Sequence, residues 1–120
     1  MLKILLVDDD QVVLTVTSEL LKILGHTVFC AEDGAQARIL VDSEKEIDLV
    51  LLDISLPDVS GLELFPELLE KHPGLYVAIC SGNIFEVNEE ELKKNGVSEV
   101  LCKPFDIHEL HDILQRVEQK

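Results

Sequence analysis

Short apolar runs alternate along the chain with segments of helical periodicity. The runs cover residues 4–7, 28–31, 49–53, 76–81 and 100–102. Continuous apolar runs of this length are typical of strands that are covered on both faces, as in a parallel sheet. Strands that alternate strictly with helices predict βα units. The pattern therefore predicts an α/β fold built on a parallel sheet.

The segments between the runs carry the signals of helices. Apolar residues recur at helical spacing from residue 12 to residue 24, and Gly25 follows as a C-terminal stop. A second helix is predicted over residues 36–42 and a third is predicted to end near residue 71. Pro66 predicts that this third helix starts late or is bent, because a proline within a helix clashes with the carbonyl four residues before it.

Side chains suited to cap helices precede the remaining helical segments. Asn88 is a predicted N-cap for a short helix, and Asp106 is a predicted N-cap for the last helix. Asp10 is interpreted as negative charge at the N-terminus of the first helix rather than as a ligand. Together, the elements predict a flavodoxin-like, doubly wound sheet of five strands in the order 2-1-3-4-5, with five helices, and residues 1–120 as a single domain.

Polar side chains end four of the apolar runs. They are Asp8 and Asp9, Asp53, Ser81, which Gly82 follows, and Lys103. Ligands of open parallel sheets bind beyond the carboxyl ends of the strands, and in the predicted order a crevice opens between the first and third strands. We therefore expect these side chains to meet at one edge of the sheet.

This set of groups indicates a cation site that also binds a phosphoryl group. Three neighbouring carboxylates repel one another unless a cation joins them. Ligands that are all oxygen favour a hard ion, Mg²⁺ ahead of Ca²⁺. The ammonium of Lys103 and the hydroxyl of Ser81 suit phosphoryl oxygens. A carboxylate such as Asp53 can itself act as the nucleophile and form an aspartyl phosphate.

The composition narrows the range of partners and compartments. A formal net charge of −14 argues against sequence-independent nucleic-acid binding and against anionic membrane surfaces. No stretch approaches the roughly 20 apolar residues of a membrane span, and the first residues are too few for a signal-peptide core. Cys30, Cys80 and Cys102 lack metal-site spacing and are expected to be small buried hydrophobic residues. We expect a cytoplasmic protein.

The motifs at the strand ends resemble those of the receiver domain of bacterial response regulators. In order, they are Val7-Asp8-Asp9, Leu52-Asp53-Ile54-Ser55-Leu56-Pro57 with Gly61, Ser81-Gly82, and Lys103-Pro104-Phe105. A single run of aspartates is weak evidence of such a domain, whereas these motifs in the family's order are specific. The resemblance covers the whole chain.

The resemblance implies a phosphoacceptor and a metal site. Asp53 would accept the phosphoryl group from a phosphohistidine on a sensor histidine kinase or phosphotransfer protein. Asp9 and Asp53 would bind Mg²⁺ directly, together with the backbone carbonyl of Ser55, and Asp8 would hold the ion through water. The domain would assist only its own phosphorylation and dephosphorylation, so it is not expected to be an enzyme acting on other substrates.

The resemblance also implies how the phosphoryl group would be held. Lys103 would pair with a phosphoryl oxygen or, before phosphorylation, with the acceptor carboxylate. Ser81 would move to hydrogen-bond the phosphoryl group, and this motion would be the switch. The backbone N–H groups of Ile54 and Gly82 would complete the cradle. A cis bond between Lys103 and Pro104 would aim the lysine into the site.

Three positions bear on the switch and on how long it lasts. Val100 stands where the family often has an aromatic residue that swings inward, so we expect the readout to run through residues 83–96 instead. Ser55 and Asn83 match the variable positions that tune hydrolysis of the acyl phosphate in the family. Both are small and polar, so we expect a phosphorylated lifetime that is not unusually long.

We expect no output domain within these 120 residues, so the output is expected to act through partner binding. A stand-alone regulator, a relay intermediate and a part of a longer protein all fit this expectation. In the family, the face formed by the fourth helix, fifth strand and fifth helix binds a downstream protein or a second copy. The apolar residues of interest on this face are Ile84, Phe85 and Val87.

Two other functions compete with this interpretation. One is a receiver-like interaction module that is never phosphorylated, but such modules usually lack one or more of the acidic pair, Asp53, Ser81 and Lys103. The other is a flavodoxin-like nucleotide or flavin binder. That function needs a phosphate-binding loop after the first strand, where the aspartates at 8–10 would repel an anionic cofactor. A colourless purified protein would exclude the flavin version.

Overall fold

The computed structural model describes residues 1–44, 46–83, 85 and 87–120. Within this part of the chain, strands and helices alternate from the first strand to the last helix. The strands are β1 (Lys3–Val7), β2 (Thr27–Ala31), β3 (Leu49–Asp53), β4 (Tyr76–Ser81) and β5 (Glu99–Cys102). The helices are α1 (Gln11–Ile23), α2 (Gly34–Ser43), α3 (Gly61–Lys71), α4 (Glu89–Lys94) and α5 (Ile107–Glu118).

The strands form one parallel sheet in the order β2-β1-β3-β4-β5. This order confirms the predicted doubly wound topology. In the register, Val7 lies opposite Leu52, and Asp53 lies opposite Cys80. The carboxyl ends of β1, β3 and β4 therefore meet at the same edge, where the polar side chains were expected.

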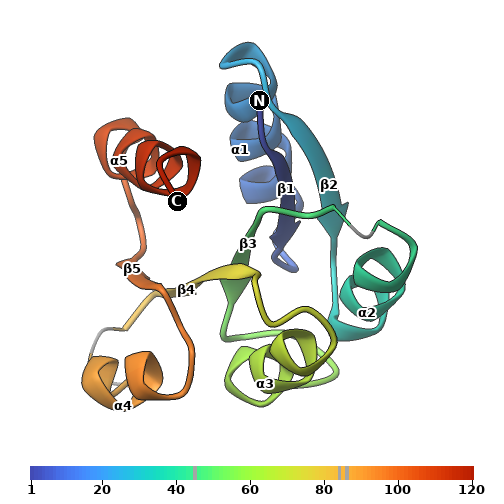
Figure 1. Cartoon of the computed structure of the whole chain (residues 1–120), viewed down its shortest axis with the longest axis vertical. Helices are drawn as coiled ribbons and strands as arrows, with labels where there is room; N and C mark the ends of the chain where they lie inside the picture. Colours follow the sequence, from blue (N-terminus) through green and yellow to red (C-terminus); the bar gives the residue numbers. More distant parts are fainter. Residues whose placement is uncertain (45, 84, 86) are drawn as a thin grey trace.

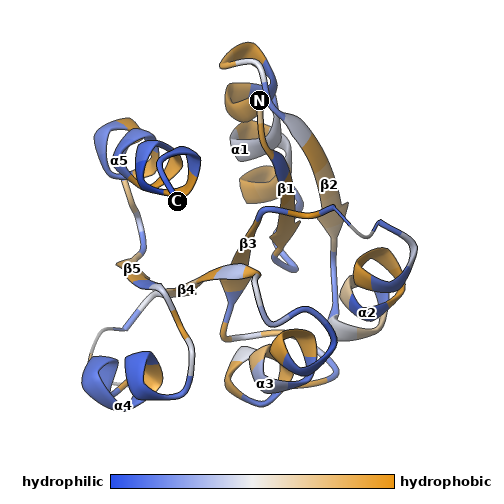
Figure 2. Ribbon diagram, viewed as in Figure 1, coloured by the Kyte–Doolittle hydropathy of each residue, from blue (hydrophilic) through white to orange (hydrophobic). Residues whose placement is uncertain are grey.

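Helices cover both faces of the sheet (Figure 1). The buried side chains of α1 and α5 pack on one face, and those of α2, α3 and α4 pack on the other. Colouring by hydropathy shows apolar strands between the two layers and hydrophilic outer faces on α4 and α5 (Figure 2). This double cover explains why the strands are continuously apolar rather than alternating. Among the described residues, no helix combines the length and apolar character of a membrane span.

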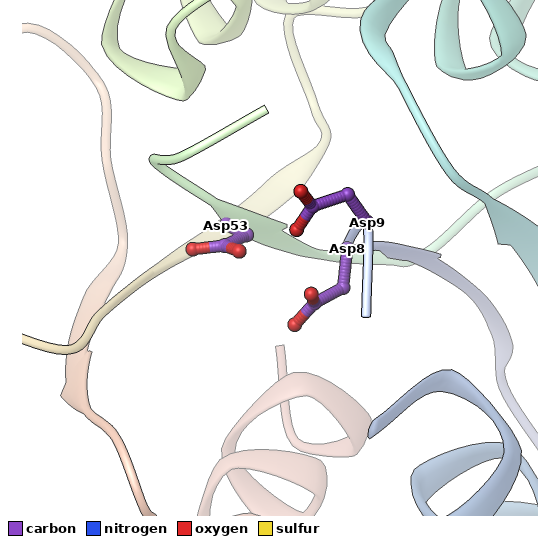
Figure 3. Close-up of side chains that lie close together, drawn as sticks. All are labelled: Asp8, Asp9 and Asp53. Atoms are coloured by element: carbon purple, nitrogen blue, oxygen red, sulfur yellow. The ribbon is translucent and has the colours of Figure 1, made fainter. Parts of the chain in front are cut away.

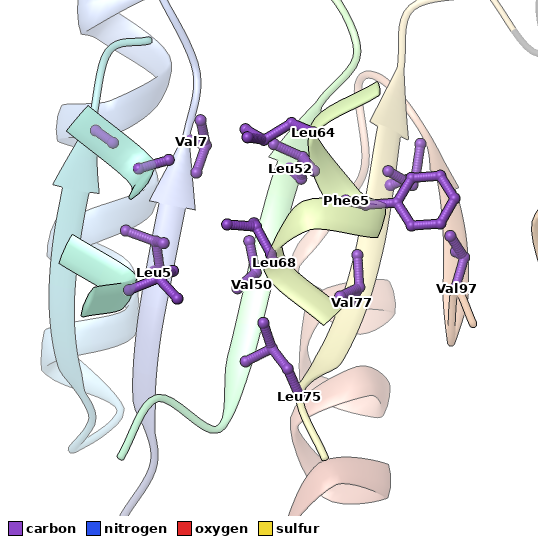
Figure 4. Packing of buried hydrophobic residues seen from close by; sticks show 14 of the residues in the cluster. Leu5, Val7, Val50, Leu52, Leu64, Phe65, Leu68, Leu75, Val77 and Val97 are labelled. Atoms are coloured by element: carbon purple, nitrogen blue, oxygen red, sulfur yellow. The ribbon is translucent and has the colours of Figure 1, made fainter. Parts of the chain in front are cut away.

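The core on the α3 side is closely packed around the central strands. In Figure 4, side chains of α3 lie against those of β1, β3 and β4. The α3 residues are Leu64, Phe65 and Leu68, all of them buried. Because β3 is buried along its whole length, its last residue, Asp53, is held at a fixed position at the edge of the sheet.

The predicted helix caps are present. The Asp10 carboxylate accepts N–H groups of Val12 and Val13 at the start of α1. Asn88 accepts an N–H group in the first turn of α4. Asp106 forms a reciprocal capping box with the third residue of α5. Local side-chain chemistry therefore fixed the starts of these helices.

The helix that contains Pro66 was predicted to start late or to be bent, and it does not start late. The helix begins at Gly61, is capped by the Ser60 side chain, and continues through Pro66 to Lys71. A proline within a helix costs ~3 kcal/mol. Burial of each large apolar side chain of α3 is worth about 1.5–3 kcal/mol, and three are buried. Packing onto the sheet thus outweighs the cost of the proline.

Replacing Leu68 by alanine tests this packing. Leu68 is 1% exposed in α3, so Leu68→Ala is expected to lower the free energy of unfolding by about 2–5 kcal/mol. Urea unfolding followed by circular dichroism measures the change. Ile39 on α2 is 65% exposed, and the control Ile39→Ala is expected to change stability by about 0.5 kcal/mol or less. Similar losses in the two variants would contradict the placement of the core.

Candidate functional site

Three carboxylates meet beyond the carboxyl ends of β1 and β3 (Figure 3). Asp8 and Asp9 follow β1, and Asp53 ends β3. One oxygen from each of the three lies within 4.8 Å of the others. Asp8 and Asp53 are only 6% and 7% exposed, whereas Asp9 lies in contact with solvent. The cluster is therefore buried at Asp8 and Asp53 and open to solvent at Asp9.

Lys103 bridges the two buried carboxylates. Its Nζ atom lies 2.6 Å from Asp8 Oδ2 and 3.1 Å from Asp53 Oδ2. The lysine follows β5, and its backbone N–H donates to the Ser81 carbonyl at 2.7 Å. The peptide bond between Lys103 and Pro104 is cis. The contact with Asp8, which the sequence did not indicate, is the shorter of the two ion pairs.

Burial and the ion pairs act in opposite directions on these charges. Burial raises the pKa of Asp53, the bonded ammonium of Lys103 lowers it, and repulsion from Asp8 raises it, so that the net shift is upward. Burial also lowers the pKa of Lys103, but its hydrogen bonds and attraction to Asp8 and Asp53 outweigh this effect, and its pKa is raised. The lysine therefore stays charged beside the two buried carboxyl groups.

Ser81 lies at the same edge, but its hydroxyl group faces its own turn. It is buried at the end of β4, and its Oγ donates to the Asn83 carbonyl at 2.9 Å. The same Oγ accepts the Asn83 N–H at 3.1 Å. Gly82 between them is exposed. The hydroxyl would have to leave these bonds before it could donate to a group bound at the carboxylates.

The residues after Asp53 are also already hydrogen-bonded. The N–H of Ile54, which the resemblance assigns to a phosphate cradle, donates to the Cys80 carbonyl at 3.2 Å. The N–H of Ser55 donates to Asp53 Oδ1 at 3.4 Å. Ser55 itself is exposed and pairs with Ser60 in an isolated antiparallel bridge. The structure thus brings both residues to the site, with their N–H groups engaged within the protein.

Cys80 lies on β4, opposite Asp53 in the sheet. Burial raises the pKa of its thiol to about 12, so it stays protonated at neutral pH. With Asp8, Asp53 and Lys103, it lines a cavity of about 20 Å³, large enough for a single water molecule. A neutral thiol of this kind is neither a strong nucleophile nor a metal ligand.

The expectation that all three cysteines are buried is wrong for two of them. Cys80 is buried, but Cys30 and Cys102 are exposed. These two lie on β2 and β5, the edge strands of the sheet. An edge strand has a neighbour on one side only, so its side chains are covered less completely than those of the central strands.

The chemistry of the donor set fits a hard divalent cation. Asp8, Asp9 and Asp53 offer carboxylate oxygens, and both Asp9 and Ser55 are open to solvent, as an ion that keeps several of its waters requires. The Lys103 ammonium supplies a fixed positive charge beside the same oxygens. The site can therefore bind a cation and an anionic oxygen group side by side.

Known proteins that are similar to this chain belong to one family. The family model described as the response regulator receiver domain matches residues 4–115. The transcriptional regulatory protein CpxR of Klebsiella pneumoniae is 38% identical over 110 residues, which cover 90% of this chain and 45% of that protein. The chain spans between 23% and 54% of the length of the first curated relatives.

Solved structures show the same fold. A CheY-like receiver domain protein from Methanospirillum hungatei has a TM-score of 0.89 at 26% identity, covering 99% of this chain and 95% of that one. The response regulator TrrA from Thermotoga maritima, solved in complex with Mg²⁺-BeF, has a TM-score of 0.86 at 28% identity. That alignment covers 98% of this chain and 99% of the other. The chain therefore belongs to the family of response regulator receiver domains.

Proposed function

We propose that the chain accepts a phosphoryl group on Asp53 in a two-component or phosphorelay pathway. A histidine kinase or a phosphotransfer protein would supply the group. The observation that carries the proposal is the position of the Lys103 ammonium, 3.1 Å from the Asp53 carboxylate at the edge of the sheet. A carboxylate held beside a positive charge is suited to attack phosphorus, because the ammonium can neutralise negative charge on the phosphoryl oxygens.

The transfer would exchange one bond to phosphorus for another. An oxygen of ionised Asp53 attacks the phosphorus of a phosphohistidine, and a P–O bond forms as the P–N bond breaks. The imidazole nitrogen keeps the electron pair of the broken bond. The ionised form of the acceptor carboxylate needs no general base. Catalysis then depends on alignment and charge neutralisation, which the ion pairs of Lys103 support.

Mg²⁺ is the cation that we assign to the carboxylate cluster. Asp9, Asp53 and the backbone carbonyl of Ser55 would hold it directly, and Asp8 would hold it through water. When bound, the ion neutralises charge on the transferring phosphoryl group. The open side of the cluster at Asp9 supports this assignment, since Mg²⁺ gives up its waters reluctantly.

The switch would begin at the hydroxyl of Ser81. To donate to the phosphoryl group, Oγ must leave the Asn83 carbonyl that it contacts at 2.9 Å. Because the Asn83 N–H and carbonyl both bind this hydroxyl, its departure would release the first turn of the segment that leads to α4. Val100 is too small to carry an aromatic signal, so we assign the readout to residues 83–96.

The released segment leads to the face where we place the output. Phe85 is 93% exposed and Val87 is half-buried, whereas Ile84 lies outside the described residues. A downstream protein or a second copy would bind at the face formed by α4, β5 and α5.

The net charge of −14 bears on nucleic-acid binding, and we propose that the domain does not itself bind nucleic acid. We place the domain in the cytoplasm, because that is where the kinase that supplies the phosphoryl group would act.

The phosphorylated state would have an ordinary lifetime. Ser55 and Asn83, which flank the site, are both exposed, so water can approach an acyl phosphate on Asp53. The domain would in this way assist its own dephosphorylation. An acyl phosphate that persists for many hours in Mg²⁺ buffer would contradict this part of the proposal.

Incubation with a small phosphodonor tests the function directly. Acetyl phosphate with Mg²⁺ is expected to add one phosphoryl group to the folded protein, detected by intact-protein mass. Asp53→Asn is expected to show no adduct, because an amide is not a nucleophile of this kind. Chelation of the metal by EDTA is expected to prevent the adduct in the wild type. No adduct from acetyl phosphate or phosphoramidate in folded protein would favour the interaction module that is never phosphorylated.

Substitution of Lys103 tests the balance of charge at the site. Lys103→Met leaves Asp8 and Asp53 facing each other without a counter-charge. This is expected to lower the free energy of unfolding by up to roughly 3 kcal/mol. We expect the melting temperature to fall without Mg²⁺ and to rise more than that of the wild type when Mg²⁺ is added. Formation of the phosphoryl adduct is expected to slow.

The control for this test is Lys22→Met, which removes the same charge from the exposed surface of α1. It is expected to respond to Mg²⁺ as the wild type does. If Lys103→Met gained no more stability from Mg²⁺ than this control, the ammonium and the cation would not share the carboxylates.

A further inference from the structure

The loop that follows β3 returns to the strand it leaves. The N–H of Gly61 donates to the Ile54 carbonyl at 2.8 Å and closes residues 55–60 at their base. A Cβ atom at Gly61 would collide with the backbone carbonyl of Asp53, so only glycine permits this close return. The loop therefore starts and ends against the backbone of the proposed phosphoacceptor.

The far end of this loop is bound by a different element. Both carboxylate oxygens of Asp58 accept backbone N–H groups from the first turn of α2. Gly34 donates to Oδ1 at 2.8 Å, and Ala35 donates to Oδ2 at 3.0 Å. These N–H groups have no partner within their own helix. The hydrogen bond from Gly34 is the main reason that the pKa of Asp58 is lowered, so the carboxylate is charged at neutral pH.

Apolar contacts also hold the loop of residues 55–60 against the start of α2, but they do not fix the orientation of the loop. A Cβ atom at Gly34 would collide with the Val59 side chain, so the loop and the start of α2 touch directly. Leu56 and Val59 pack on the core that lies beneath α2 and α3. Hydrophobic burial is non-directional, whereas the two hydrogen bonds of Asp58 set the orientation of the loop.

The start of α2 does not depend on Asp58 alone. Asp33 is the N-cap of this helix, and its Oδ1 accepts the N–H of Gln36 at 2.8 Å. The helix thus has a cap from its own sequence and a second carboxylate from a loop 23 to 24 positions away. The second carboxylate connects α2 to the loop that carries Ser55.

We propose that Asp58 is a positioning residue of the phosphorylation site. By binding the first turn of α2, its carboxylate holds the loop so that the backbone of Ser55 stays beside Asp53. Asp58 touches neither the metal nor the phosphoryl group. This role rests on the proposed function, in which the Ser55 carbonyl is a ligand of Mg²⁺.

Amide hydrogen exchange in metal-free protein tests whether Asp58 holds the loop. In Asp58→Ala, the N–H groups of Gly61 and Ser55 are expected to exchange faster than in the wild type. The matched control is Asp33→Ala, which removes the same charge and a cap of the same helix without touching the loop. It is expected to leave both amides unchanged. Unaltered exchange in Asp58→Ala, or equal acceleration in the two variants, would overturn the proposal.

Calorimetric titration with Mg²⁺ tests the consequence for the site. Asp58→Ala is expected to weaken Mg²⁺ binding about tenfold, which is typical for loss of a partner that orients a ligand. Asp58→Asn is expected to bind with intermediate affinity, because an amide has one acceptor oxygen and its NH₂ group faces the second N–H. Asp33→Ala is expected to bind as the wild type does.

The outcomes of the titration separate this role from the function on which it rests. Equal weakening in Asp58→Ala and Asp33→Ala would assign the effect to a less stable α2 and overturn the positioning role. A wild-type protein that binds no Mg²⁺ would overturn the proposed function and, with it, this role in metal binding. The exchange experiment uses metal-free protein, so it would still show whether Asp58 holds the loop.

Discussion

The ammonium of Lys103 keeps two buried carboxylates together at one edge of the sheet. Asp8 and Asp53 are both nearly covered, so water does little to screen their repulsion. The Nζ atom contacts both, at 2.6 and 3.1 Å, and belongs to a residue just after β5, 95 positions from Asp8 in the chain. One ammonium cannot balance three carboxylates. The remaining negative charge is what a divalent cation would neutralise.

The parallel sheet brings these groups together, and much of this was predictable from the sequence. Apolar runs identified the strands because both faces of each strand are covered by helices. Polar residues at the ends of those runs identified the edge where Asp8, Asp9 and Asp53 meet. Local caps at Asp10 and Asp106 identified helix starts, because a cap and the N–H groups it binds are close in sequence.

Features that depend on contacts distant in sequence were not predictable in this way. Asp58 follows a proline in the loop after β3, and no local pattern shows that it binds α2. The start of α3 before Pro66 depends on how much apolar surface the helix buries on the sheet. The exposure of Cys30 and Cys102 depends on which strands lie at the sheet edges. In each case, the deciding partner is specified by the tertiary fold rather than by neighbouring residues.

Locating the phosphoryl group on the chain would test the central claim most directly. Borohydride reduces an aspartyl phosphate to homoserine, which peptide mass mapping can assign to one position. After treatment with acetyl phosphate and Mg²⁺, we predict homoserine at position 53 and at no other aspartate. Homoserine in place of Asp8 or Asp9 would contradict the account, because either result would put the acceptor just after β1 rather than at the end of β3.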